Sequence, residues 1–361
     1  LAIMPFALIV LSGDTSGPAW IGYAGAGLAF LLVGAGLHTT QTAGLALATD
    51  LAPPESRPRV VAFLYVMLLV GMVVTSIVFG WLLSDFSQLR LIQVVQGAAA
   101  VTMILNVIAL WKQEVRDPSR TRGLAANEPG FLESWRAMAA SGPWPRVLVS
   151  IGLGTAAFSM QDILLEPYGG EILHLSVGQT TALTGFLACG TLLGFVVASH
   201  VLTSGFDPFR LAALGSIAGL AAFPLVILSS HVESAQIFRA GTLLIGFGGG
   251  LFSVGTLTAV MSMSKGGRHG MALGVWGAVQ ATAAGTAIAC GGLIRDGVGA
   301  LATSGQLGEA LATPSTGYTA VYHIEIVLLF ATLVAIGPLV GMGRVNKSRM
   351  SGKFGLAEFP G

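Results

Sequence analysis

The sequence is poor in charged residues. Asp, Glu, Lys and Arg make up 10% of its 361 residues, whereas hydrophobic residues make up 53% and the mean hydropathy is +0.78. A soluble domain carries about a quarter charged residues, because it needs them to cover its surface. A chain with so few must be solvated by lipid, which excludes a water-soluble globular protein. The net charge of +1 gives no reason to expect nucleic acid as a partner.

Cysteine is nearly absent, and so are the motifs of soluble enzymes. Cys189 and Cys290 both lie inside apolar runs, which offers neither a disulfide framework nor the spacing of a metal site. There is no phosphate-binding loop, nucleophile elbow or His-Glu-x-x-His motif in the sequence. We therefore expect no enzyme activity. Glycine is abundant instead, with 50 residues, and small residues let membrane helices approach one another closely.

The apolar residues occur in runs long enough to span a membrane as helices, which takes about 20 residues. These runs cover residues 20–49, 60–83, 91–111, 147–165, 179–202, 209–230, 237–262, 270–294 and 319–342. Residues 1–11 are apolar but too short to span, and we interpret them as the end of a helix whose beginning is missing. The sequence thus predicts an all-α polytopic membrane protein of about nine helices plus a stump.

The longest polar interval, from Lys112 to Arg146, divides the predicted helices into two groups. We expect four regions: a remnant of an N-terminal helix bundle (1–111), a cytoplasmic connector (112–146), a six-helix bundle (147–342) and a cytoplasmic tail (343–361). Within the connector, residues 130–140 could form an amphipathic helix on the membrane surface or a solvated linker.

A weak internal repeat relates the two groups. Residues 34–80 and 246–291 each contain a glycine-rich helix, a short basic turn and a second helix that opens with a small residue. Parallel repeats of this kind relate the two six-helix halves of major facilitators. The repeat favours that fold, here truncated at its N-terminus.

Basic residues fall almost entirely on one side of the predicted helices. The other side holds only Arg90, Arg239 and Arg295 of the 18 Lys and Arg residues. Because basic loops stay in the cytoplasm, the connector and the C-terminus are predicted to be cytoplasmic. Four charged residues near the first turn on that side, Asp50, Glu55, Arg57 and Arg59, form a candidate conformational charge relay.

Polar residues at membrane depth are the candidates for function, because a charge at a helix centre costs about 2.5–3.5 kcal/mol on insertion scales. His38 lies twelve residues before Asp50, about 18 Å into the membrane, and shares a helix face with Gln41. A neutral imidazole there could bind a metal or a proton, or simply pack against a neighbouring helix.

Two further groups complete the candidate ligand-binding residues. Asp162 and Glu166 are four apart and follow Gln161, so we expect the two carboxyls on one helix face, with Pro167 and Gly169–Gly170 ending that helix. Glu171 would then be solvated. Glu325 is expected at the outer end of the last helix.

Two strings carry a resemblance to a known family. The segments TDLAPPESRPRVVAFLYVMLLVGM (49–72) and FSMQDILLEPYGGEILHLSVGQTTALTGF (158–186) resemble the PucC-type light-harvesting assembly proteins of phototrophic bacteria. These form the bacteriochlorophyll delivery family within the major facilitator superfamily. The resemblance runs along essentially the whole chain.

The resemblance implies an assembly factor for antenna complexes that delivers or binds bacteriochlorophyll as cargo. His38 would then be a possible axial ligand to the pigment magnesium. Implied partners are the lipid bilayer, light-harvesting apoproteins and pigment-synthesis enzymes, in the bacterial inner, intracytoplasmic photosynthetic membrane. Two alternatives remain: a proton-coupled major facilitator transporter of a small solute, and a purely structural partner of a photosynthetic complex.

Overall fold

The computed structural model describes residues 4, 18–51, 57–111, 133, 135–136, 139–140, 142–263 and 269–341. Within these residues the regular structure is entirely helical. The chain forms two compact units: Leu1–Leu68 with Trp81–Glu128, and Leu69–Gly80 with Pro129–Gly361. The first unit is small, and the second contains most of the buried residues.

The helices of the first unit are apolar on all sides. They are α2 (Ala19–Leu51), most of α3 (Arg57–Leu82) and α4 (Gln88–Leu110). Helix α4 begins at an N-cap serine, Ser87, whose hydroxyl accepts a hydrogen bond from the Arg90 N–H at 3.1 Å. No residue of α4 is buried.

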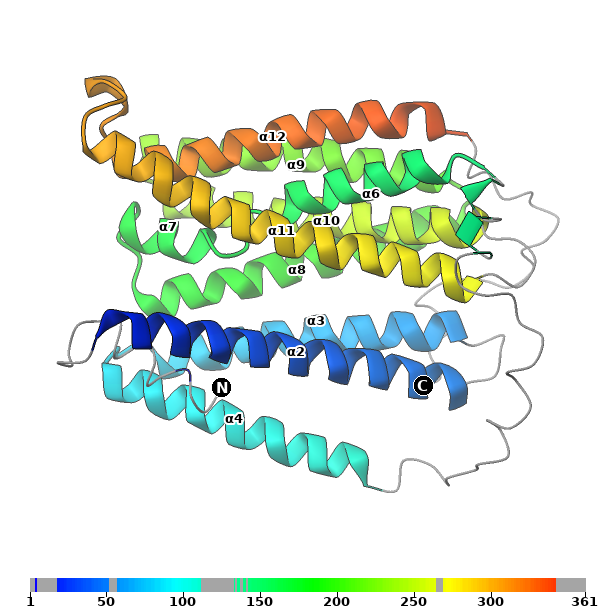
Figure 1. Cartoon of the computed structure of the whole chain (residues 1–361), viewed down its shortest axis with the longest axis horizontal. Coiled ribbons are helices and arrows are strands. Elements are labelled where there is room, and N and C mark those ends of the chain that lie inside the picture. The colour runs from blue at the N-terminus through cyan, green and yellow to red at the C-terminus, as the bar shows by residue number, and fades with distance from the viewer. Residues whose placement is uncertain are drawn as a thin grey trace. The chain divides into compact units, whose positions relative to one another are not determined.

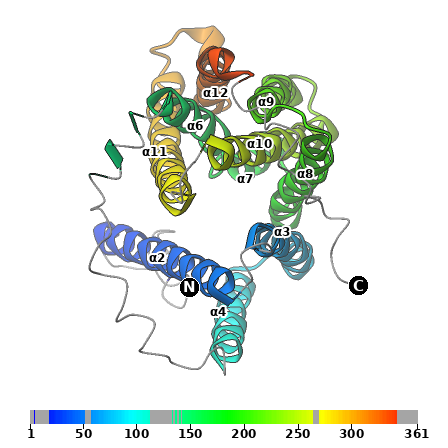
Figure 2. The same ribbon diagram turned by 90° about the vertical axis from the view of Figure 1, so that its right-hand side faces the viewer.

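Among the described residues, the helices of Pro129–Gly361 in the second unit form a bundle, together with two short 3₁₀ turns. They are α6 (Trp144–Ser159), α7 (Leu165–Glu171), α8 (Val177–Thr203), α9 (Pro208–His231), α10 (Ala235–Met263), α11 (His269–Thr303), η2 (Glu309–Leu311), α12 (Thr316–Ile336) and η3 (Gly337–Leu339). Helix α10 packs against α8 and α9, while α6 packs against α11 and α12 (Figure 1, Figure 2). Helix α12 also packs against α9, which closes the bundle.

Glycines bring α8 and α10 into backbone contact. On α8, a Cβ added to Gly190 would overlap the carbonyl oxygen of Leu243, and one added to Gly194 would lie 2.6 Å from the carbonyl oxygen of Phe247. On α10, a Cβ at Gly246 would overlap the carbonyl oxygen of Leu187. Such spacing of small residues lets membrane helices gain dispersion contacts that larger side chains would prevent.

One segment of α3, Leu69–Gly80, belongs to the second unit. Its Ser76 is buried and donates a hydrogen bond to the carbonyl oxygen of Thr181 at 2.7 Å. The same hydroxyl accepts from the N–H of Gly185 at 2.9 Å. A small polar side chain thus joins α3 to the glycine-rich face of α8.

The predicted all-α fold is confirmed, with two corrections to its helices. Among the described residues, eight helices are long and apolar enough to cross a membrane, and the predicted run 147–165 is instead divided between α6 and α7. Helix α11 continues to Thr303, so Arg295 lies on a helix and not in a loop. The division into four regions and the orientation stay predictions.

Candidate functional site

The break between α6 and α7 is the most unusual feature of the bundle. Helix α6 ends at Ser159, α7 begins at Leu165, and residues 160–164 form turns between them (Figure 1). Pro167 explains the position. It has no N–H, and in a continuous helix its ring would clash with the carbonyl of Ile163, whereas the first turn of a new helix tolerates it.

The expectation that Pro167 and Gly169–Gly170 end a helix was therefore wrong. All three residues lie inside α7, and the interruption comes before them. As a result Asp162 and Glu166 do not share a helix face: Asp162 lies in the break and Glu166 in the first turn of α7. The Glu166 carboxylate accepts a hydrogen bond from the Thr184 hydroxyl of α8 at 3.0 Å.

Gln161 is the buried residue at the break, with no exposed surface. Its side-chain N–H donates to the carbonyl oxygen of Phe158 at 3.0 Å and to Oδ1 of Asp162 at 2.8 Å. Its Oε1 is buried without a hydrogen-bond partner. The break also frees the Gln161 N–H from the helical ladder, because the backbone bonds around it run from Asp162 to Ser159 and from Leu164 to Gln161.

Glu325 lies opposite the break on α12. The sequence placed it at the outer end of the last helix, and this was wrong: Glu325 follows Thr316 by nine residues in a helix of 21. The error arose because the helix was expected to begin at residue 319 and to run to 342. Glu325 is completely buried, and neither carboxyl oxygen has a hydrogen-bond partner. The backbone N–H of Gln161 acts on this carboxyl.

Tyrosine rings surround these polar groups. Tyr322, one turn before Glu325 on α12, is buried, and its hydroxyl has no hydrogen-bond partner. The ring of Tyr168 on α7 meets Tyr322 edge-on, with centroids 5.5 Å apart. Phe223 of α9 stacks on Tyr322, with ring centroids 6.3 Å apart. Gln161, Tyr322 and Glu325 therefore bring unpartnered polar atoms into one tightly packed region.

A second polar group lies nearer the other end of α7, and the sequence did not reveal it. Glu171 accepts hydrogen bonds from Arg295 at 2.5 Å and from the Tyr318 hydroxyl at 2.8 Å. The Arg295 guanidinium also lies 4.5 Å from the centre of the Tyr318 ring and pairs with Asp296. Glu171 is thus held by a cation and a phenol, contrary to the expectation that it is simply solvated.

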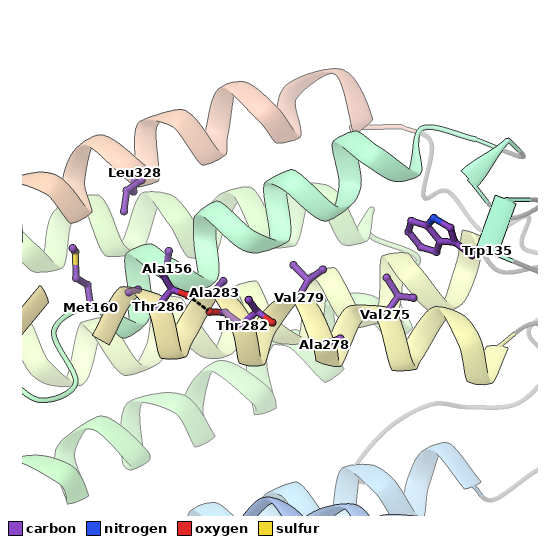
Figure 3. Close-up of a pocket in the computed structure, with 11 residues that line it drawn as sticks. Trp135, Ala156, Met160, Val275, Ala278, Val279, Thr282, Ala283, Thr286 and Leu328 are labelled. Atoms are coloured by element: carbon purple, nitrogen blue, oxygen red, sulfur yellow. Dashed lines mark hydrogen bonds between the residues drawn. The ribbon is translucent and has the colours of Figure 1, made fainter. Parts of the chain in front are cut away.

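An apolar groove runs beside the break, between α6, α11 and α12 (Figure 3). Its volume is about 820 Å³. The floor is a row of small and β-branched residues on α11, from Val275 to Ala287, and Met160 and Leu328 lie toward one end. Trp135 lies at the other end. Met160 immediately precedes Gln161, so the groove and the buried polar region share a wall.

The remaining candidates belong to the first unit. Gln41 is half-buried on α2, in the first unit, and the side chain of His38 lies outside the described residues. The side chains of Asp50, Arg57 and Arg59, and the whole of Glu55, also fall outside them. Of the described residues, no cluster of three or more His, Cys, Asp or Glu could hold a metal ion.

Comparison with known proteins places the chain in a family. The model of the PUCC protein family matches residues 1–343. The chain belongs to the PUCC family. Protein PucC of Rhodovulum sulfidophilum is 54% identical over 82% of this chain and 66% of its own length. Protein PucC of Cereibacter sphaeroides is 48% identical over 94% of this chain and 73% of its own length.

Another relative matches along the entire chain. It is described as an uncharacterized protein in the puhA-bchM intergenic region of Rhodobacter capsulatus, and it is 51% identical over 100% of this chain and 76% of its own length. The chain therefore spans about two thirds to three quarters of these relatives, from 66% to 76%.

A solved structure supports the fold. A bacterial homologue of the human lysosomal transporter Spinster, in an inward-facing and unoccupied conformation, superposes with a TM-score of 0.59 over 95% of this chain and 84% of that one. The sequences are 17% identical, so the likeness concerns the fold alone. The predicted all-α polytopic fold is confirmed, and the chain shares the fold of this transporter.

Proposed function

We propose that this chain assists the assembly of light-harvesting antenna complexes and that bacteriochlorophyll docks in the apolar groove between α6, α11 and α12. The observation that carries the first part is family membership over residues 1–343. The groove supports the second part, because a planar macrocycle with an apolar tail needs a long, flat, apolar surface.

The groove fits the ring and tail of such a pigment better than it fits a polar solute. Of the eleven residues that line it, only Thr282, Thr286 and the indole N–H of Trp135 offer polar side-chain atoms. The Thr286 hydroxyl donates to the Thr282 carbonyl at 2.7 Å (Figure 3). None of these lining residues is a histidine, asparagine or glutamine. The pigment magnesium would take its fifth ligand from water or from a residue beyond the lining.

The site of action follows from the same proposal. The chain would act in the inner, intracytoplasmic photosynthetic membrane, with the connector and C-terminus in the cytoplasm. Its partners would be the antenna apoproteins and the enzymes that supply the pigment. In this arrangement the exposed apolar faces of α2 and α4 contact lipid or antenna helices.

Docking in the groove can be tested by a substitution that fills it with a large side chain. In a phototrophic bacterium that carries the full-length gene, Thr282→Trp should reduce near-infrared antenna absorbance several-fold and lower the pigment-to-protein ratio of the purified protein. Leu293→Trp is the control, because Leu293 lies on the same helix, is 74% exposed and does not line the groove. Immunoblots must show equal protein levels in both strains.

The outcomes separate the proposal from its alternatives. Unchanged antenna absorbance with Thr282→Trp, at normal protein level, would refute docking in the groove. Normal antenna levels after complete deletion of the gene would refute the assembly role, and a proton-dependent loss of solute uptake in that deletion would favour the transporter. We also expect Asp162→Asn to lower antenna absorbance more than Glu309→Gln, which alters an exposed carboxyl in η2.

A further inference from the structure

The buried region beside the break contains unpartnered polar atoms that the proposed function does not use. They are Oε1 of Gln161, the hydroxyl of Tyr322 and both carboxyl oxygens of Glu325. All three residues have no exposed surface. A buried polar group without a partner costs about 1–3 kcal/mol, and an ionised carboxylate costs considerably more. Three such side chains in one region indicate a ligand that the protein atoms alone do not supply.

The charges around Glu325 indicate the sign of that ligand. The charged group that acts on its carboxyl is Asp162, which is itself acidic. Tyr168 of α7 and Tyr318 and Tyr322 of α12 are neutral neighbours, and α9 contributes Phe223. Arg295 of α11 is already bound to Glu171 and Asp296. The ligand is therefore positive.

We propose that Glu325, Gln161 and Tyr322 form a buried cation site in which the bound cation is a proton carried by Glu325. The atoms available to bind a cation are all oxygens. The region is closely packed, with Tyr168, Tyr322 and Leu329 in one continuous core cluster. A proton needs no coordination shell of several oxygens, unlike calcium or magnesium. Protonation also removes the cost of a buried carboxylate directly.

Gln161 connects this site to the surface of the bundle. Its side-chain amide binds Asp162, which is exposed, while its backbone N–H faces Glu325, which is not. The backbone contact depends on the break, because a continuous helix would engage the Gln161 N–H in its own ladder. The proton on Glu325 and the shape of the break are thus linked: removing the proton places a charge beside the freed N–H and the neighbouring carboxylate.

The test measures the proton through unfolding of the full chain in detergent, and it requires no pigment. If folded Glu325 holds a proton that the unfolded chain releases, raising the pH near neutrality must favour unfolding. The unfolding equilibrium constant of the unaltered protein should then rise roughly tenfold more per pH unit than that of Glu325→Gln. Glu309→Gln, at an exposed carboxyl, should behave like the unaltered protein.

A second measurement counts the proton directly. On unfolding in weakly buffered detergent at neutral pH, the unaltered protein should release one more proton than Glu325→Gln. Equal proton release and parallel pH dependence in the two proteins would overturn the proposal. Stabilisation of the unaltered protein, but not of Glu325→Gln, by sodium over choline at constant pH would assign the site to a metal cation and also overturn it. Either result leaves the antenna role standing, because neither readout depends on pigment.

Discussion

Helices α4 and α10 have nearly the same apolar character and opposite surroundings. Their membrane-spanning windows have mean hydropathies of 1.9 and 1.7, yet none of the α4 window is buried in protein and 56% of the α10 window is. The two helices differ in the surroundings of their glycines. Gly97 of α4 has nothing near it, whereas a Cβ at Gly246 or Gly250 of α10 would meet the backbone of α8. Hydropathy therefore decides that a helix enters the membrane, and small residues decide whether it packs against its own chain.

The largest difference in the free energy of unfolding should appear when a buried tryptophan and an exposed tryptophan are each replaced by alanine. Trp144, at the start of α6, is 1% exposed, whereas Trp111, at the end of α4, is 73% exposed. Trp144→Ala should lower the free energy of unfolding by about 3–5 kcal/mol, because it opens a cavity in the core. Trp111→Ala should change it little. Thermal unfolding in detergent measures both, and similar losses would show that the two regions are equally packed.

A glycine pair tests the helix contact itself. Gly190→Ala should destabilise the protein by about 1–3 kcal/mol, because the new methyl group overlaps the Leu243 carbonyl and forces α8 and α10 apart. Gly97→Ala on α4 should be neutral or stabilise by up to about 1 kcal/mol, since alanine favours helix over glycine. Denaturant titration of the two variants compares them, and a stable Gly190→Ala protein would contradict the close approach.

Ser76 tests the part of α3 that belongs to the second unit. Ser76→Ala removes the hydrogen bonds to the Thr181 carbonyl and the Gly185 N–H and should cost about 1 kcal/mol. The neighbouring Thr75 is exposed, and its hydroxyl bonds within its own helix to the Gly71 carbonyl. Thr75→Ala should therefore lower the unfolding temperature less than Ser76→Ala does. Equal decreases in the two variants would argue against the contact between Ser76 and α8.

The smallest effect is expected at the ion pair of Glu171 and Arg295. Glu171 is 52% exposed, so Glu171→Gln should lower stability by at most about 1 kcal/mol, because solvent and salt screen such pairs. The difference from the unaltered protein should shrink further as sodium chloride is added. A large, salt-independent loss would show that this pair is shielded from solvent in the folded protein.

The sequence predicted the helices well, because long apolar runs separated by polar turns have few other interpretations. It also selected Gln161, Asp162 and Glu325, because polar side chains at membrane depth are rare. The break was missed because Pro167 was interpreted as the end of one helix, when it fits equally well in the first turn of the next. The two possibilities differ only in packing, which a single sequence does not contain.

Other parts of the site could not be predicted for the same reason. Glu171, Arg295 and Tyr318 come from three helices, and no local pattern links residues 124 and 147 positions apart. The burial of Glu325 depended on where α12 begins, and helix ends are the least certain part of such predictions. The glycine content indicated close packing, but not that Gly190 and Gly246 face each other's helices while Gly97 faces none.

The interruption at residues 160–164 also has a mechanical meaning. A continuous α-helix resists bending because every turn is tied to the next, and here those ties are reduced to a few turn bonds. The seven residues of α7 form a short rigid helix about 10 Å long beyond this break. Glu171 lies at the far end of this helix and is bound to Arg295 of α11, whereas Asp162 lies in the break. A small change of angle at the break would produce a larger displacement of Glu171. The Glu171–Arg295 contact and the geometry around Gln161 would therefore change together.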